Sequence, residues 1–145
     1  MGMVDVSDKE VISREAEAAG VIVLAPETIE RIRRGEIKKG DPLLVAEVAG
    51  MNAAKQTHLL IPHCHQISLE TARVSFELLD RHMEARAYVR AHARTGVEME
   101  ALVAVSIALC TIWDMVKYLE KDTAGQYPDT RIRDVRVVRK VKGRA

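Results

Sequence analysis

The clearest pattern in the chain is an alternation of apolar and polar residues within positions 67–93. The alternation runs over residues 67–79 and resumes over residues 83–93, and its period is that of a half-buried strand. The polar residues Asp80, Arg81 and His82 separate the two runs. We therefore expect two antiparallel strands joined as a hairpin.

The next apolar pattern has the period of a helix. Thr95 and Glu98 have the spacing of a capping box, in which the Thr95 hydroxyl meets the first amides and the Glu98 carboxylate reaches back. We expect a long helix after this box, to about residue 121. Its apolar stripe recurs at intervals of three and four residues, at Leu102, Val105, Leu109, Ile112, Val116 and Leu119.

The same helix has a second apolar face, formed by Val103, Ile107 and Cys110 and continued by Asp114 and Lys117. One sheet covers only one side of a helix, so we expect a partner subunit to cover this second face. Partial burial beside such a contact would lower the pKa of Lys117. An ordinary exposed ion pair near the helix end is the alternative interpretation.

The remaining segments complete the predicted order of elements. They are a polar N-terminal extension over residues 1–19, a strand over 21–24, a helix over 27–34, a strand over 43–48, a helix over 49–60 and a strand over 132–138. From residue 43 the order is strand, helix, strand, strand, helix, strand. This order predicts an α+β fold of the ferredoxin-like, split βαβ type, with a four-stranded antiparallel sheet and two helices on one face.

Composition narrows the class of protein. The 145 residues are enough for one domain, over residues 1–145, with a core of its own. A net charge of +1 and five aromatic residues argue against binding to nucleic acid. The longest uncharged run, over residues 101–113, is too short to span a membrane, so we expect a buried helix and no membrane partner. Cys64 and Cys110 cannot form a disulfide scaffold, and the absence of a leader pattern favours a cytoplasmic location.

The densest polar cluster is His63, Cys64 and His65, which follow Pro62 directly. Histidine and cysteine are the common ligands of zinc. A structural zinc site usually has a second pair of ligands, whereas Cys110 stands alone in the long helix. Phosphate binding, proton transfer and simple exposure on a loop stay open for these residues.

Charged residues mark two further places. Glu98, Met99 and Glu100 open the long helix, where carboxylates can bind an amine or a base edge, although acids are common in first helical turns. Lys39, Lys55 and a basic last strand would suit a polyphosphate, and a solvated face is the alternative. Neither a Walker loop nor a Gly-x-Gly-x-x-Gly motif is present in the sequence.

Several motifs occur in a specific order along the chain. They are Met3-Val4-Asp5-Val6-Ser7-Asp8-Lys9, Lys39-Gly40-Asp41, Ala49-Gly50-Met51-Asn52-Ala53-Ala54-Lys55, Leu60-Ile61-Pro62-His63-Cys64-His65, Thr95-Gly96-Val97-Glu98-Met99-Glu100-Ala101-Leu102 and Thr111-Ile112-Trp113-Asp114-Met115-Val116-Lys117. From residue 3 to about residue 140, this set resembles the cyclic pyranopterin monophosphate synthase family, accessory protein C of molybdenum cofactor biosynthesis.

The resemblance implies a ferredoxin-like subunit in a hexamer built as a trimer of dimers, with active sites at the dimer interface. It implies conversion of a GTP-derived substrate, 3′,8-cyclo-7,8-dihydro-GTP, to cyclic pyranopterin monophosphate with release of pyrophosphate. This chemistry needs no redox cofactor, and the sequence has no dedicated metal site. Asp114 and Lys117 match the family's catalytic pair. The positions that match its substrate-binding residues are His63, Cys64, His65, Glu98, Met99, Glu100, Lys39, Lys55, Lys9 and Arg14.

The chain departs from the family pattern at several positions. His63 stands where Leu is usual, Gln66 where Pro is usual and Gln56 where Arg is common. The family's tail often reads Lys-Ser-Gly-Gly-Lys-Ser-Gly, whereas this chain ends Lys140-Val141-Lys142-Gly143-Arg144-Ala145, so Lys140 or Lys142 would supply the tail's charge. Two other functions stay open: a non-catalytic module that binds a nucleotide or metabolite, and a zinc-dependent hydrolase that uses His58, His63, Cys64 and His65.

Overall fold

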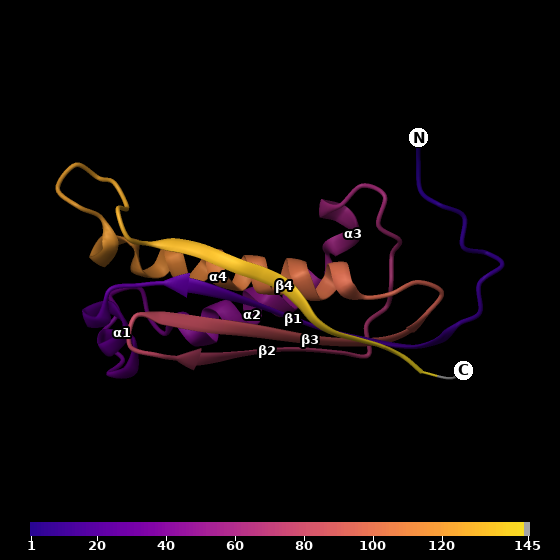
Figure 1. Cartoon of the computed structure of the whole chain (residues 1–145), viewed down its shortest axis with the longest axis horizontal. Helices are drawn as coiled ribbons and strands as arrows, with labels where there is room; N and C mark the ends of the chain where they lie inside the picture. Colours follow the sequence, from indigo (N-terminus) through magenta and orange to yellow (C-terminus); the bar gives the residue numbers. More distant parts are fainter. Residues whose placement is uncertain (144–145) are drawn as a thin grey trace.

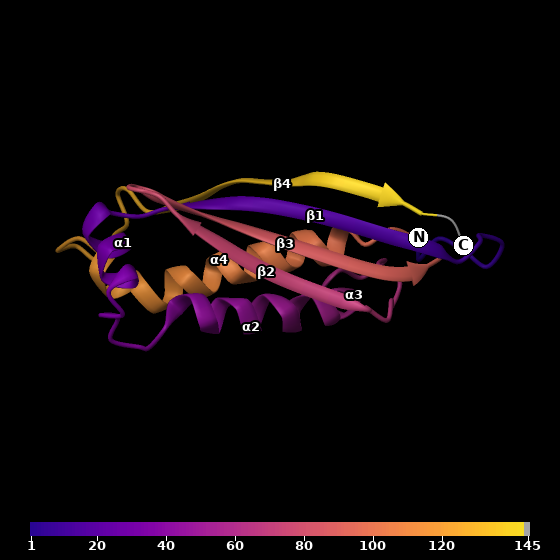
Figure 2. The same ribbon diagram turned by 90° about the horizontal axis from the view of Figure 1, so that it is seen from below.

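The computed structural model describes residues 1–143, so the last two residues of the tail lie outside it. Four strands form one sheet in the order β2-β3-β1-β4, and every neighbouring pair is antiparallel. Helices α2 and α4 lie side by side against one face of the sheet (Figure 1 and Figure 2). In chain order the elements are β1 (Ile12–Val23), α1 (Pro26–Arg33), α2 (Pro42–Lys55), α3 (Thr57–Leu60), β2 (Thr71–Leu78), β3 (His82–Ala93), α4 (Glu98–Glu120) and β4 (Arg131–Lys142). The predicted ferredoxin-like α+β fold is confirmed, but its first strand is β1 and not residues 43–48, and its first helix, α2, begins earlier than predicted.

The first strand is β1, and it lies in the middle of the sheet between β3 and β4. The sequence predicts most of this segment to be a polar extension, which in the structure comprises only residues 1–11. On the helix side β1 presents the small residues Ala16, Ala18 and Gly20. A Cβ atom on Gly20 would lie 2.8 Å from Cδ1 of Leu109, so α4 leaves no room for larger side chains. Small core residues give little hydrophobic signal, so the sequence predicts only the end of this strand, as the strand over residues 21–24.

The predicted strand over residues 43–48 is wrong, because these residues belong to α2. The Asp41 carboxylate accepts hydrogen bonds from the amides of Leu43 (3.0 Å) and Leu44 (3.3 Å) and so caps the helix. Pro42 follows the cap, at a position where a helix tolerates proline. The predicted helix over residues 49–60 is correspondingly two helices, because α2 ends at Lys55 and α3 is a single turn after it.

The buried face of α2 is made of small residues, which bring it close to α4. A Cβ atom on Gly50 would lie 3.1 Å from the carbonyl oxygen of Ala104 and 3.5 Å from Cβ of Ala108. Three of the larger apolar side chains of α2 are exposed instead: Leu44, Val45 and Val48. The helix layer therefore has an apolar outer surface.

The hairpin and the last strand are confirmed. Strands β2 and β3 pair antiparallel, and the amide of Leu79 donates to the carbonyl of His82 (2.9 Å) in the turn between them. β2 begins at Thr71, later than predicted, and β4 runs further than predicted, to Lys142. The pairing of β4 with β1 is irregular near Asp134, whose φ is 57°.

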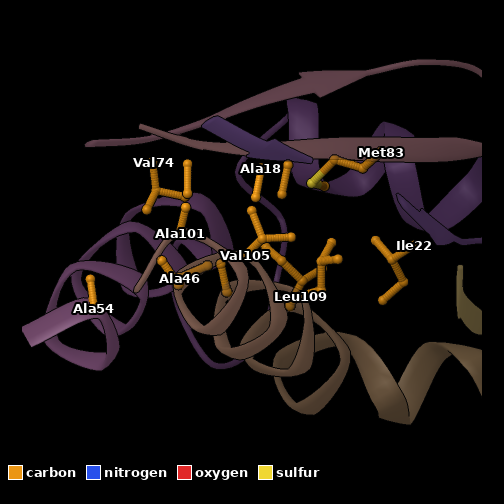
Figure 3. Close-up of a cluster of buried hydrophobic side chains, with 14 of the residues drawn as sticks. Ala18, Ile22, Ala46, Ala54, Val74, Met83, Ala101, Val105 and Leu109 are labelled. Atoms are coloured by element: carbon orange, nitrogen blue, oxygen red, sulfur yellow. The ribbon is translucent and has the colours of Figure 1, made fainter. Parts of the chain in front are cut away.

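The long helix α4 is confirmed and forms the centre of the core. Its stripe residues Val105, Leu109, Ile112 and Val116 are fully buried. Figure 3 shows Val105 and Leu109 among side chains from the sheet and from α2. α4 is long and apolar enough to cross a membrane, with a mean hydropathy of 1.8, but 56% of that segment is buried within the chain, as in the core helix of a soluble protein.

Candidate active site

The candidate residues form two groups at opposite ends of α4. We call the region around Glu98 and Glu100, in its first turn, the glutamate end. We call the region around Asp114 and Lys117, near its last turn, the aspartate–lysine end. The last strand contacts the glutamate end through Lys140, and the loop between α1 and α2 contacts the aspartate–lysine end through Lys39.

At the glutamate end, a pocket of about 390 Å³ opens between the start of α4 and the segment that follows α3. Its lining residues are Ile61, His63, Cys64, His65, Thr95, Gly96, Glu98 and Met99. The structure thus brings the His-Cys-His cluster beside two of the three residues that open α4. The volume is in the range of pockets that bind small molecules.

Glu98 forms an ion pair with the tail and does not form the predicted capping box. Its Oε1 lies 2.5 Å from Nζ of Lys140, and the helix begins after Val97 without a side-chain cap. Burial alone would raise the pKa of Glu98, but the hydrogen bond and charge of Lys140, with help from Arg14, lower it overall. The capping-box prediction is therefore wrong, and Lys140 supplies a positive charge at this end of the helix.

Glu100 is the most unusual group at the glutamate end. It is 3% exposed, and neither of its carboxylate oxygens has a hydrogen-bond partner of good geometry among the described residues. Burial, with repulsion from Glu98, raises its pKa to about 7, although its own backbone amide opposes the shift. Burial and the two glutamates also raise the pKa of the Cys64 thiol, which disfavours a thiolate nucleophile.

Basic residues surround the glutamate end. Arg14 is 4% exposed and donates to the carbonyl oxygens of Ala93 (3.4 Å) and Arg94 (3.2 Å). Lys55, the last residue of α2, is exposed, and α2 ends alongside the first turns of α4 (Figure 2). Together with Lys140, these residues place positive charge around the end of α4 that carries the two carboxylates.

The N-terminal segment also borders this end. Nε2 of His65 donates to the carbonyl oxygen of Val4 (2.7 Å). Nε of Arg94 donates to the carbonyl oxygen of Lys9 (3.2 Å), so the backbone at Lys9 is held near the strand ends. Residues 4–9 therefore lie beside the pocket.

At the aspartate–lysine end, Asp114 lies between two lysines. Nζ of Lys117 is 2.9 Å from Oδ1 of Asp114, and Nζ of Lys39 is 3.4 Å from Oδ2 and 2.9 Å from its backbone carbonyl. The hydrogen bond and charge of Lys117, then those of Lys39, lower the pKa of Asp114. Asp114 in turn raises the pKa of Lys117, so the predicted lowering by burial is wrong for the single chain, in which both groups are ionised.

The two ends carry the ordered motifs that the family resemblance rests on. The sequence matches the model of the MoaC family over residues 3–143. The chain belongs to the MoaC family. It is 56% identical over 141 residues to the "Probable cyclic pyranopterin monophosphate synthase" of Thermococcus kodakarensis, which covers 97% of this chain and 90% of that protein. The proteins of the same name are 55% identical in Sulfolobus acidocaldarius (97% of this chain, 98% of that protein) and 51% identical in Methanosarcina mazei (99% and 91%).

The MoaC match spans both ends of α4, yet one chain does not bring them together. His63, Cys64, His65, Glu98 and Met99 share a pocket, with Arg14 and Glu100 beside it. Asp114, Lys117 and Lys39 form a separate cluster. About sixteen residues of α4, roughly 24 Å, separate Glu98 from Asp114.

Two aromatic residues of this MoaC chain were missed from the sequence. The Tyr118 hydroxyl accepts a hydrogen bond from the backbone amide of Lys38 (2.7 Å), and Tyr127 adds to the upward shift in the pKa of Lys117. Tyr118 follows Asp114 by one helical turn, so helical spacing could have indicated it. Tyr127 lies in the loop before β4, where no periodic pattern places a side chain.

The zinc hypothesis finds no support in this MoaC chain. Within residues 1–143, no three His, Cys, Asp or Glu side chains are grouped so that they could hold a metal ion. The Cys110 thiol lies on α4 and is exposed, whereas Cys64 is half-buried at the glutamate end. The charged groups at that end are carboxylates and cations, which suit an organic ligand with both amine and phosphate groups.

Proposed function

We propose that this chain is a cyclic pyranopterin monophosphate synthase, which converts 3′,8-cyclo-7,8-dihydro-GTP to cyclic pyranopterin monophosphate and pyrophosphate. The observation that carries the proposal is the match to the MoaC family over residues 3–143, which includes Asp114 and Lys117 in direct contact. The relatives that bear this activity in their names cover nearly the whole chain. The enzyme is of the lyase type and acts on a small molecule.

The proposed substrate explains the charges of both groups. Its triphosphate requires cations, and Lys39, Lys55, His65, Arg14 and Lys9 are the candidates. Its purine-derived ring carries amines and carbonyls. Carboxylates and backbone groups at Glu98, Met99 and Glu100 would bind these, with the Cys64 and His63 segment as the pocket wall.

The ionised pair at the aspartate–lysine end suits proton transfer. Ring opening and rebuilding need protons to be moved, and closure of the cyclic phosphate needs a substrate hydroxyl to attack phosphorus while the bond to pyrophosphate breaks. Lys117 begins protonated and can donate a proton, and Asp114 begins ionised and can accept one or orient the ammonium. Positioning and charge stabilisation contribute the rest.

We propose further that each active site is shared between two copies of the chain. The glutamate end of one copy and the aspartate–lysine end of the other would together surround one substrate, because roughly 24 Å separates the two ends of one α4. An apolar outer surface on the helix layer supports such an assembly. Its exposed residues include Leu44 (58%), Val45 (44%), Val48 (45%) and Ile107 (36%). The hexamer and the cytoplasmic location stay predictions.

The assay that tests the function uses the purified full chain with 3′,8-cyclo-7,8-dihydro-GTP. We expect pyrophosphate and the cyclic pterin product to be released in equal amounts. Binding of the substrate without release of pyrophosphate would contradict the enzyme and favour the non-catalytic binding module. A matched Asp114→Asn variant shows whether the measured turnover belongs to this chain and not to a contaminant.

A further inference from the structure

The loop between α1 and α2 carries Lys39 to the aspartate–lysine end. The amide of Gly40 donates to the carbonyl of Ile37 (3.1 Å), so Lys38 and Lys39 are the two central residues of a turn. Ile37 is buried and anchors one side of the turn, and Gly40, with a φ of +117°, closes the other. Both lysines are exposed at the tip.

Two residues of α4 contact this tip, one at Lys38 and the other at Lys39. The Tyr118 hydroxyl accepts a hydrogen bond from the amide of Lys38 (2.7 Å). Asp114 accepts from Nζ of Lys39 through its backbone carbonyl (2.9 Å) and its Oδ2 (3.4 Å). Asp114 and Tyr118 are four residues apart and thus one above the other on the helix surface.

We propose that Tyr118 is a positioning residue for the active site: its hydroxyl fixes the Lys38 backbone and thereby holds the Lys39 ammonium on Asp114. A lysine side chain has four rotatable bonds and loses much conformational entropy when it is held in one place. A surface ion pair alone holds it weakly. The hydrogen bond at the preceding amide fixes the start of the Lys39 side chain, so fewer conformations remain to be restricted.

The consequence concerns the charge beside the catalytic pair. Lys39 and Lys117 both contact the Asp114 carboxylate, from the loop and from the helix respectively. If Tyr118 releases the loop, Asp114 keeps Lys117 as its partner but loses the second ammonium. The pair would then meet the substrate with one positive charge fewer in place.

The first test measures the position of Lys39 without any enzyme activity. The full chain and its Tyr118→Phe variant are acetylated briefly at low reagent concentration, and the rate at Lys39 is compared with that at the exposed Lys121 by mass spectrometry. Loss of one hydrogen bond corresponds to a change of about 2- to 10-fold, so we expect Lys39 to react several-fold faster in the variant. An unchanged ratio of Lys39 to Lys121 would overturn the proposal.

Tyr88→Phe is the matched control, because the Tyr88 hydroxyl is also hydrogen-bonded, to Glu15 on the outer face of the sheet. This variant loses a comparable interaction with no connection to the loop, so its Lys39 should react as in the wild type. Faster reaction of Lys39 in Tyr88→Phe as well would indicate general loosening and overturn the specific role of Tyr118.

The second test rests on the proposed function and uses a double-mutant cycle. Tyr118→Phe should lower kcat/KM about 2- to 10-fold in the wild-type background and less than about 2-fold in a Lys39→Ala background, because the hydroxyl acts through Lys39. Equal losses in both backgrounds would contradict the mechanism. The wild type and Lys39→Ala are the two backgrounds of the cycle. If neither of them shows turnover while Tyr118→Phe still accelerates the acetylation of Lys39, the proposed function fails and the positioning role stands.

Discussion

Glu98 and Asp114 lie on the same helix, about sixteen residues and roughly 24 Å apart along its axis. Glu98 contacts the tail through Lys140, and Asp114 contacts the α1–α2 loop through Lys39. The family resemblance predicts a substrate-binding role for Glu98 and a catalytic role for Asp114, yet neither side chain can span the distance. The proposed reaction therefore requires a second copy of the chain to bring the two groups together.

Loss of the Lys117 ammonium should abolish turnover without loss of assembly. Lys117→Ala removes the proposed proton donor, whose pKa Asp114 raises, and general acid–base groups contribute about 10²- to 10⁴-fold to rate. We expect a fall in kcat of at least about 100-fold in the pyrophosphate assay. Lys121→Ala, one helical turn further on, is the control and should retain normal kcat. Near-normal turnover in Lys117→Ala would remove this residue from the catalytic pair.

Introduction of a charge at Ile107 should break the assembly. The Ile107 side chain is 36% exposed, whereas Val103 on the same predicted face is 9% exposed, so a charge at Val103 would disturb the chain itself. An unpaired charge in a contact between copies costs several kcal/mol. Light scattering of Ile107→Asp should report a lower mass than that of the wild-type assembly, with Ile107→Leu assembled as the wild type. An unchanged mass for Ile107→Asp would show that this face is not an interface.

The buried Glu100 carboxyl should make the chain less stable as the pH rises. Its pKa is about 7 in the folded chain, whereas the ordinary value for a glutamate, which applies to the unfolded chain, is 4.5. Between these pH values the folded chain therefore binds more protons than the unfolded chain. The free energy of unfolding therefore falls as the pH rises from 4.5 to about 7 and stays low above it.

Glu100→Gln removes this titration. Urea unfolding should show that the variant gains about 2 to 3 kcal/mol on the wild type between pH 5 and pH 8. Glu98→Gln is the matched control, because the pKa of Glu98 is lowered and its loss should give no such gain. Parallel pH profiles for wild type and Glu100→Gln would contradict the buried state of this carboxyl.

The contact between β1 and α4 leaves no space at Gly20. A Cβ atom there would lie 2.8 Å from Cδ1 of Leu109 and 2.9 Å from Cγ1 of Val105, and both side chains are fully buried. Gly20→Ala should therefore lower the free energy of unfolding by about 1 to 3 kcal/mol in urea titrations. Gly2→Ala meets nothing within 4 Å and should be nearly neutral. A neutral Gly20→Ala would mean that α4 can move away from the sheet.

The sequence predicts the fold class but not all of its elements, because the core is built from small residues in two places. The stripe of α4 contains Leu109 and Ile112, whose large side chains give a periodic signal. The core-facing residues of β1 include Ala16 and Ala18, which give almost none. In α2 the large residues Leu44, Val45 and Val48 are exposed, so the apolar run resembles a strand, whereas the Asp41-Pro42 start signal indicates the helix.

The site residues could be named from motifs, but their grouping could not. Helical spacing predicts that Asp114 and Lys117 meet, and the structure has them 2.9 Å apart. The ion pair of Glu98 with Lys140 depends on the course of β4, and the contact of Tyr118 with Lys38 depends on a turn. Such long-range contacts leave no periodic pattern in the sequence.

Subunit complementation tests the shared active site most directly. Lys117→Ala and His65→Ala are co-expressed with two different affinity tags, and assemblies that carry both tags are purified. Each variant alone should be inactive, whereas a mixed dimer has one site with both defects and one with neither. Each mixed dimer should therefore have about half of the wild-type activity, and an assembly of several randomly paired dimers about a quarter. Mixed assemblies as inactive as the parent variants would contradict a site built from two copies and would place the whole reaction within one chain.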